Sequence, residues 1–146
     1  MIIKELDVPG LEELARELAA SVKPGDRYFL SGPLGAGKST FARAFIRFLG
    51  VEGAIPSPTF IMDSVYSIRK SGLVVHHIDL YRLDGRREEM QMLGFEEILD
   101  SEAVVLIEWP ERMEDYRERR GCTVSISNGV TPNSRRVQVE WNLAGY

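Results

Sequence analysis

One short segment constrains the fold of this 146-residue chain more than any other feature. Residues 32–39 read Gly-Pro-Leu-Gly-Ala-Gly-Lys-Ser, which fits the pattern of glycine, four residues, glycine, lysine, and serine or threonine. The apolar run at 27–31 predicts a short buried strand before it, and the spacing at 38–49 predicts a helix after it, ended by Gly50. We expect the inner face of that helix to carry Phe41, Phe45, Phe48 and Leu49. A strand, a glycine-rich turn and a helix in this order are the context that the motif requires.

The motif predicts a P-loop, in which backbone N–H groups surround phosphate oxygens. The glycines allow the chain to turn these groups inward, and the helix that begins at Lys38 adds its positive dipole end. We expect Lys38 to reach the β and γ phosphates. Ser39 places a hydroxyl where Mg²⁺ needs an oxygen ligand, and Mg²⁺ on a nucleotide usually takes only one or two protein oxygens. The segment therefore predicts a bound nucleoside triphosphate with Mg²⁺.

A P-loop also needs an acid at the end of a neighbouring strand to hold Mg²⁺, and two candidates are present. Asp79 ends a strand-like run that contains His76 and His77, and Glu108 ends a cleaner apolar run at 103–107. Either acid could hold Mg²⁺ directly or through water. The two histidines point to opposite faces of an extended segment, so we interpret them as structural residues and not as joint metal ligands.

The remaining pattern predicts one α/β domain over residues 1–146, with helices around a mixed parallel and antiparallel sheet. Helical spacing is expected from Leu11 to Val22, after Asp7 and Pro9, which are suited to a helix start, and again around 88–99. The β-rich runs 60–68 and 73–79 are joined by a glycine-containing turn, which predicts an antiparallel hairpin. Alternating residues from Cys122 onward, with Asn-Gly and Pro-Asn turns between them, predict a C-terminal β-hairpin.

The charge, the apolar runs and the cysteine count of the chain disfavour several classes of protein. The formal net charge of −4 and the pI near 5.3 disfavour a protein that grips nucleic acid through its phosphates. The basic clusters at 86–87 and 117–120 are interleaved with acids, and we interpret them as solvated helix faces, with partner docking as the alternative. No apolar stretch approaches the ~20 residues that span a bilayer, so we expect a cytoplasmic protein without a membrane anchor. A lone Cys122 excludes an internal disulfide.

Four further segments carry a resemblance to a known family. They are Ser57-Pro58-Thr59-Phe60, Asp79-Leu80-Tyr81-Arg82-Leu83, Leu93-Gly94-Phe95-Glu96-Glu97 and Ile107-Glu108-Trp109-Pro110-Glu111. Together with the P-loop, and in this order and spacing, they resemble the TsaE (YjeE) family over residues 11–112. The match implies a three-layer fold of the P-loop NTPase type. It also implies an ATPase, weak when alone, that works with TsaD-like and TsaB-like proteins as they make threonylcarbamoyladenosine on tRNA, at the adenosine next to the anticodon. Contact with tRNA would be indirect.

The resemblance also implies roles for single residues. ATP phosphates would be bound by Gly35, Ala36, Gly37, Lys38, Ser39 and Thr40, and Glu111 would contact the nucleotide. Ser39 and Glu108 would hold Mg²⁺, with Asp79 supporting the metal and its water. Thr59 would sense the γ phosphate, so that the catalytic set is Lys38, Thr59, Asp79 and Glu108. Switch or partner-facing roles would belong to Ser57, Tyr81, Arg82 and Trp109, although a tryptophan after a central strand, like Trp109, is more often a core residue.

Two other functions fit the same motifs. A small metabolite kinase would close an arginine-bearing lid over its acceptor, and residues 111–120 could form one. Against this, 146 residues leave little chain for an acceptor pocket. A nucleotide-gated binding module would use ATP to order the segment around Thr59 and would not need hydrolysis.

Overall fold

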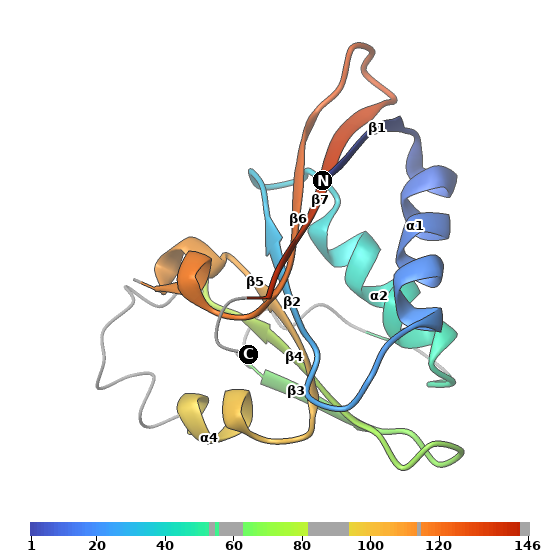
Figure 1. Ribbon diagram of the computed structural model, residues 1–146. Coiled ribbons are helices and arrows are strands. Elements are labelled where there is room, and N and C mark those ends of the chain that lie inside the picture. The colour runs from blue at the N-terminus through green and yellow to red at the C-terminus, as the bar shows by residue number, and fades with distance from the viewer. Residues whose placement is uncertain (53–54, 56–62, 82–93, 114, 144–146) are drawn as a thin grey trace.

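The computed structural model describes residues 1–52, 55, 63–81, 94–113 and 115–143, which build a seven-stranded sheet (Figure 1). In space the strands follow the order β1-β7-β6-β2-β5-β4-β3. Their bounds are β1 Ile2–Leu6, β2 Arg27–Ser31, β3 Asp63–Ser67, β4 Val74–Asp79, β5 Val104–Glu108, β6 Gly121–Asn128 and β7 Arg135–Asn142.

The sheet is mixed, as the sequence predicts. The central strands β6, β2, β5 and β4 run parallel to one another, with Tyr28 opposite both Cys122 and Leu106. Strand β3 pairs antiparallel with β4, and β7 pairs antiparallel with both β6 and β1. Both expected hairpins are therefore present.

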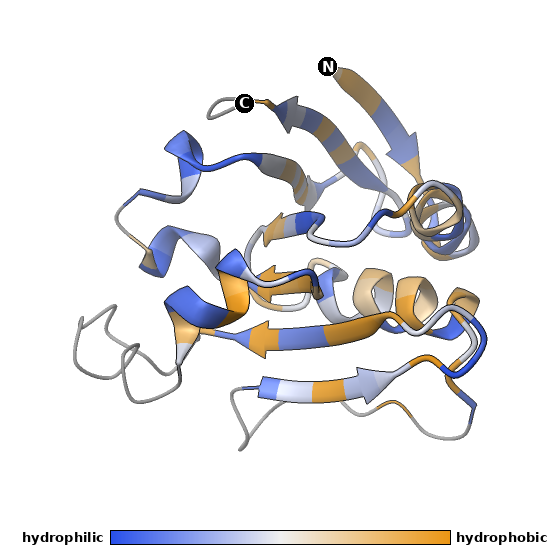
Figure 2. Cartoon of the chain, turned by 60° about the horizontal axis from the view of Figure 1, so that its bottom comes forward, coloured by the Kyte–Doolittle hydropathy of each residue, from blue (hydrophilic) through white to orange (hydrophobic). Residues whose placement is uncertain are grey.

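Helices cover both faces of the sheet and give the P-loop NTPase-type three-layer fold (Figures 1 and 2). One face carries α1 (Val8–Ala20) and α2 (Lys38–Phe48), and the other carries α4 (Phe95–Asp100) with the short 3₁₀ turns η1 (Pro110–Arg112) and η2 (Tyr116–Glu118). Side chains of the central strands alternate between two cores because successive strand residues point to opposite faces. Tyr28 and Leu30 lie in the core beneath α1 and α2, whereas Phe29 packs with Phe95 and Tyr116 on the other side.

Local sequence explains where the first helix begins. The Asp7 carboxylate accepts a hydrogen bond from the Gly10 N–H at 2.9 Å, which caps α1. Pro9 lies in the first turn, where a residue without an N–H is tolerated. The helix therefore begins between Asp7 and Pro9, the residues that the sequence marks as suited to a helix start.

The second helix ends close to its predicted boundary, but one assignment on it was wrong. Phe48 is 48% exposed rather than on the inner face. The buried stripe of α2 centres on Phe41, Ala42, Phe45 and Ile46, and Phe48 lies at its edge in the last turn. Leu49 packs partly against the core, as expected.

The structure differs from the sequence-based prediction in two further segments, whose local residue pattern is weak. Strand β1 was not predicted, because its mixed apolar and charged residues are exposed on both faces and it is held at the sheet edge through its pairing with β7. The helix expected around 88–99 is seen as α4 from Phe95, and residues 82–93 lie outside the described part of the chain. Within the described residues, none of the helices has the length and apolar character to cross a membrane.

Candidate functional site

The site lies where the carboxyl ends of β2, β5 and β4 meet the beginning of α2. The glycine-rich turn 32–37 connects β2 directly to α2. Gly32 must remain glycine, since a Cβ there would lie 2.2 Å from the Ile126 carbonyl oxygen. Gly37 has a φ of 119°, a value that side chains with a Cβ rarely adopt, and it forms the N-cap of α2. The backbone thus takes the tight turn that a phosphate-binding loop needs.

Lys38 is buried inside this turn. Its Nζ donates to the Gly32 carbonyl oxygen, lies 3.5 Å from the Pro33 carbonyl oxygen, and lies 3.4 Å from the centre of the Trp109 ring. Burial lowers the pKa of Lys38, while Glu108 and the other nearby carboxylates act in the opposite direction. The ammonium group is therefore held by neutral carbonyls and an aromatic face, with no ion pair among the described residues. Phosphate oxygens would be stronger partners for it.

Ser39 and Glu108 meet at the centre of the site. The Ser39 hydroxyl donates to the Glu108 carboxylate, with Oγ–Oε1 and Oγ–Oε2 distances of 3.1 and 3.2 Å. Two oxygen ligands at right angles on Mg²⁺, each about 2.1 Å from the ion, are separated by roughly 3 Å. The two side chains therefore suit neighbouring positions around one Mg²⁺ ion in both chemistry and spacing.

His77 joins this pair from the adjacent strand. Its Nε2 lies 2.6 Å from Glu108 Oε2, and the ring is fully buried. The interpretation of both histidines as purely structural was incomplete, because one of them contacts the candidate metal ligand. The opposite-face prediction is confirmed, since His76 turns away and its Nδ1 lies 2.8 Å from Asp63 Oδ2. Strand alternation could have indicated this position, because His77 and Asp79 are two residues apart and therefore point to the same face of β4.

Asp79 ends β4 in register with Glu108 at the end of β5. Its Oδ1 accepts the Tyr81 backbone N–H at 2.9 Å, which fixes the carboxylate at the turn. Burial raises the pKa of Asp79, the Tyr81 hydrogen bond opposes this, and the Glu108 charge adds to the increase. The two predicted acids therefore lie at one sheet edge beside Lys38.

Trp109 follows Glu108 in an unusual backbone conformation. Its φ of 60° and ψ of 50° place it in the left-handed region, which bulky residues rarely enter. The ring packs on Tyr81, with 5.0 Å between ring centres, and beneath the Lys38 ammonium group. Trp109 is thus half-buried at the rim of the site rather than a residue of the deep core.

The other predicted site residues differ in their burial, and some of them lie outside the described part of the chain. Ala36 is buried, and its carbonyl oxygen accepts a hydrogen bond from Arg135 Nε at 3.1 Å. Thr40 lies in the first turn of α2, and Gly35 is an exposed residue of the loop. Glu111 is exposed on η1, with Oε2 3.5 Å from the Ser31 hydroxyl. Ser57, Thr59 and Arg82 lie outside the described residues.

Arg135 was not anticipated from the sequence. It belongs to β7, yet it binds the P-loop backbone and the carbonyl oxygens of Pro132 and Ser134 in the preceding turn. The contact ties the C-terminal hairpin to the phosphate-binding turn. No local motif marks this residue, because the contact depends on the pairing of β6 beside β2.

The described residues do not provide a complete set of protein ligands for a metal ion. Over the described ranges, no three His, Cys, Asp or Glu side chains are grouped so as to hold a metal ion. A P-loop site of this kind needs no such group, because nucleotide phosphates and water complete the shell of Mg²⁺.

Comparison with known proteins identifies the family. The model described as threonylcarbamoyl adenosine biosynthesis protein TsaE matches residues 7–137. The chain belongs to the TsaE family. The TsaE protein of Streptomyces coelicolor is 41% identical over 111 residues, which cover 75% of this chain and 74% of that protein. The Bacillus subtilis protein of the same name is 37% identical over 113 residues, covering 77% and 68%.

The coverage varies among relatives of the TsaE family. The Rickettsia conorii TsaE protein is 46% identical over 101 residues, covering 68% of this chain but only 55% of that protein's length. Among solved structures, that of Bacillus subtilis YdiB superposes with a TM-score of 0.73 at 26% identity, covering 99% of this chain and 89% of YdiB. The chain is therefore a P-loop member of a family that takes part in tRNA threonylcarbamoyladenosine biosynthesis.

Proposed function

We propose that this TsaE-family chain, as a single domain, hydrolyses ATP with Mg²⁺ and thereby supports TsaD-like and TsaB-like proteins that modify tRNA in the cytoplasm. The observation that carries the proposal is the meeting of Ser39 and Glu108 at the start of α2. A hydroxyl and a carboxylate at this point of a P-loop are the protein ligands expected for the Mg²⁺ of a bound nucleoside triphosphate.

In this proposal the site residues have three roles, which are phosphate binding, stabilisation of charge and binding of Mg²⁺. Backbone N–H groups of residues 35–40 bind the α and β phosphates, and the dipole of α2 favours their negative charge. Lys38 exchanges the Gly32 carbonyl oxygen for β- and γ-phosphate oxygens, where its charge stabilises the transition state. Ser39 and Glu108 hold Mg²⁺, which neutralises charge on the transferred phosphoryl group.

Asp79 and the residues near it complete the site. Its partly buried carboxylate, anchored by the Tyr81 N–H, accepts hydrogen bonds from water at the metal or at the γ phosphorus. In this proposal Glu111 and Thr40 contact the nucleotide, and Thr59 senses the γ phosphate. Ser57, Tyr81, Arg82 and Trp109 pass the nucleotide state to the partner proteins.

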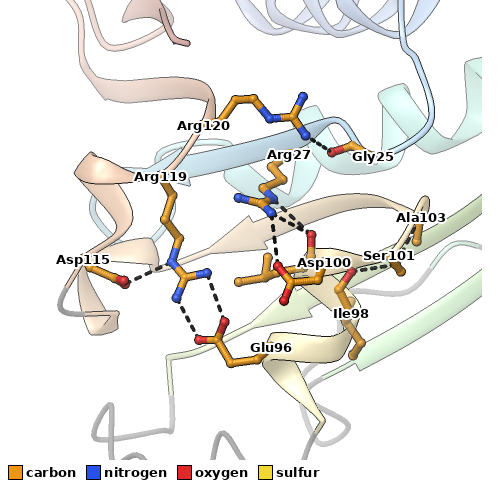
Figure 3. A network of polar contacts seen from close by, with 11 residues as sticks. Gly25, Arg27, Glu96, Ile98, Asp100, Ser101, Ala103, Asp115, Arg119 and Arg120 are labelled. Atoms are coloured by element: carbon orange, nitrogen blue, oxygen red, sulfur yellow. Dashed lines mark hydrogen bonds and ion pairs between the residues drawn. The ribbon is translucent and has the colours of Figure 1, made fainter. Parts of the chain in front are cut away.

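The kinase alternative receives no support from the region that would form its lid. Met113 and Tyr116 are buried in the core beneath α4. Arg119 binds both oxygens of Glu96, with N–O distances of 3.2 and 2.7 Å, and contacts Asp115 at 3.1 Å (Figure 3). An arginine held in this way is a structural link and not a group free to close over an acceptor. The interpretation of this basic cluster as a solvated helix face was correspondingly wrong for Arg119.

The test is ATP hydrolysis by the chain alone and with TsaD-like and TsaB-like proteins from the same organism. We expect slow turnover that the partners accelerate, because P-loop sites completed by a partner gain up to ~10³–10⁵ in rate. The Lys38→Ala protein is the control and should show no acceleration. Phosphate transfer to a metabolite without any response to the partners would refute the proposal and favour a kinase.

The binding-module alternative is separated by Glu108→Ala. If hydrolysis drives the complex, this variant binds ATP and the partners but fails to support repeated tRNA modification. Continued modification at the normal rate would show that hydrolysis is incidental and that nucleotide occupancy alone acts as the switch.

A further inference from the structure

His77 is a buried polar residue that packing alone does not explain. The ring is 0% exposed, yet Nδ1 has no hydrogen-bond partner among the described residues. Within the described part of the chain, the polar contact of the ring is that of Nε2 with Glu108 Oε2. Burial of an imidazole with one nitrogen unpaired costs free energy that an apolar residue of similar size would avoid. The contact with Glu108 is therefore the feature that distinguishes histidine from leucine at this position.

The contact divides the two oxygens of Glu108. Oε2 accepts the His77 N–H at 2.6 Å, which is short for this kind of bond and fits a charge-assisted one. The Ser39 hydroxyl contacts both oxygens, Oε1 at 3.1 Å and Oε2 at 3.2 Å, so that Oε2 carries the His77 contact in addition. The Glu108 side chain is 4% exposed, so water competes little for either oxygen. The two oxygens therefore differ in one respect: His77 holds Oε2 from within the sheet, whereas Oε1 has Ser39 as its contact among the described residues.

We infer that His77 is a positioning residue that restricts Glu108 to one metal-binding oxygen and thereby favours Mg²⁺ over Ca²⁺ at the nucleotide site. The inference rests on the proposed function, because it needs a divalent cation between ATP and Glu108. Mg²⁺ demands a compact octahedral shell with single oxygens, whereas Ca²⁺ accepts larger shells in which a carboxylate binds with both oxygens. A carboxylate whose second oxygen is held by His77 suits the smaller ion.

His77 also matters once Ser39 turns toward the metal. In the present arrangement the Ser39 hydroxyl and His77 both fix the Glu108 carboxylate. If the hydroxyl served as a metal ligand, its hydrogen bond to Glu108 would be lost. The His77 N–H would then remain the contact that fixes the rotation of the carboxylate, as hydrogen bonds to metal ligands commonly do.

The experiment measures ATP binding by calorimetry on the full chain, without divalent ion, with Mg²⁺ and with Ca²⁺. His77→Leu removes the hydrogen bond, and His77→Gln keeps a donor N–H near the position of Nε2. His76→Leu is the matched control, because it removes a histidine–carboxylate pair from the same strand on the opposite face. If His77→Leu does not fold, His77→Asn takes its place. The asparagine side chain is polar but too short to place an N–H near the position of Nε2, so it is compared with His77→Gln.

In the wild-type chain, Mg²⁺ should tighten ATP binding more than Ca²⁺ does. In His77→Leu the gain from Mg²⁺ should fall about 10- to 100-fold, the preference over Ca²⁺ should disappear, and metal-free binding should stay unchanged. His77→Gln and His76→Leu should resemble the wild type, and His77→Asn should resemble His77→Leu.

Two results would overturn the inference in distinguishable ways. A folded His77→Leu protein with the wild-type gain and the wild-type Mg²⁺ preference would show that the ring only fills space. A wild-type chain whose ATP affinity gains nothing from Mg²⁺ would refute the proposed function, and the role of His77 with it.

Discussion

Two polar clusters connect separate elements of this fold, and they differ in how their charges are balanced. The site cluster comprises Lys38, Ser39, His77, Asp79 and Glu108 at the carboxyl ends of the strands. The clamp comprises Arg27, Glu96, Asp100, Asp115 and Arg119, which join β2, α4 and η2 (Figure 3).

Solvent exposure separates the two clusters. In the clamp, Arg119 pairs with Glu96 and Asp115, whose side chains are 59% and 50% exposed. In the site cluster, Lys38 is buried, the Glu108 side chain is 4% exposed, and no ion pair between the two is formed. Charges buried without a full partner destabilise a fold, whereas ion pairs with one exposed partner can each stabilise it by up to about 1 kcal/mol. The comparison teaches that the clamp serves the structure, while the site cluster keeps binding capacity for a charged ligand.

The largest expected effect follows from removing the buried cation. Lys38→Met should reduce partner-stimulated ATP hydrolysis by at least about 100-fold, because a preorganised charge at the phosphates is lost. The free energy of unfolding should stay the same or rise, since an apolar side chain of similar length replaces a desolvated charge. Calorimetric unfolding and phosphate release measure the two effects. A loss of stability with retained hydrolysis would reverse the assignment of the clusters.

The clamp should give the opposite pattern. Arg119→Ala should lower the free energy of unfolding by about 1 kcal/mol, because a two-bond pair with Glu96 is lost while the acids remain hydrated. ATP affinity and hydrolysis should not change. Arg117→Ala on the same turn is the control, and its effect should stay within about 0.5 kcal/mol. Denaturant titration separates these values, and an Arg119 variant with weakened ATP binding would contradict the division.

A spectroscopic change should report on Lys38 directly. In a Trp141→Phe background, Trp109 becomes the single tryptophan of the chain. ATP should draw the Lys38 ammonium group away from the indole face and change Trp109 emission by tens of per cent, since the cation lies 3.4 Å from the ring centre. The change should be absent in Lys38→Met. The same ATP-induced change in both proteins would show that Trp109 responds to something other than the lysine.

The last prediction concerns a residue outside both clusters and has no effect on ATP hydrolysis. Burial raises the pKa of Cys122 to about 12, so the folded thiol should react with DTNB at pH 8.5 about 1000-fold more slowly than an exposed thiol. Between the ordinary value of 9.0 and about 12, the unfolded chain loses this proton while the folded chain keeps it. Stability should therefore fall as the pH rises through that range. Rapid labelling of the native protein would contradict the burial of β6.

Much of the fold could be predicted because its signals are local. The P-loop, the apolar run of β5 and the two hairpins are each encoded in consecutive residues, and all appear as expected. Strand β1 escaped prediction because only its pairing with β7 defines it, and Phe48 was misplaced because helical spacing does not show where a buried stripe ends.

The site could be predicted only in part, for a similar reason. Ser39, Asp79 and Glu108 follow from where a P-loop and strand ends meet in a parallel sheet. The contacts of His77 with Glu108 and of Arg135 with Ala36 join residues on different strands. They depend on strand order and register, which the separate motifs do not state.

The central claim is that Glu108 and Ser39 together hold the Mg²⁺ of bound ATP. The most direct measurement is the Mg²⁺-dependent gain in ATP affinity for the wild type, Ser39→Ala, Glu108→Ala and the double variant. The account predicts that each single change removes most of the gain, that the double change removes little more, and that metal-free affinity is kept. A Glu108→Ala protein that retains the full gain from Mg²⁺ would contradict the account.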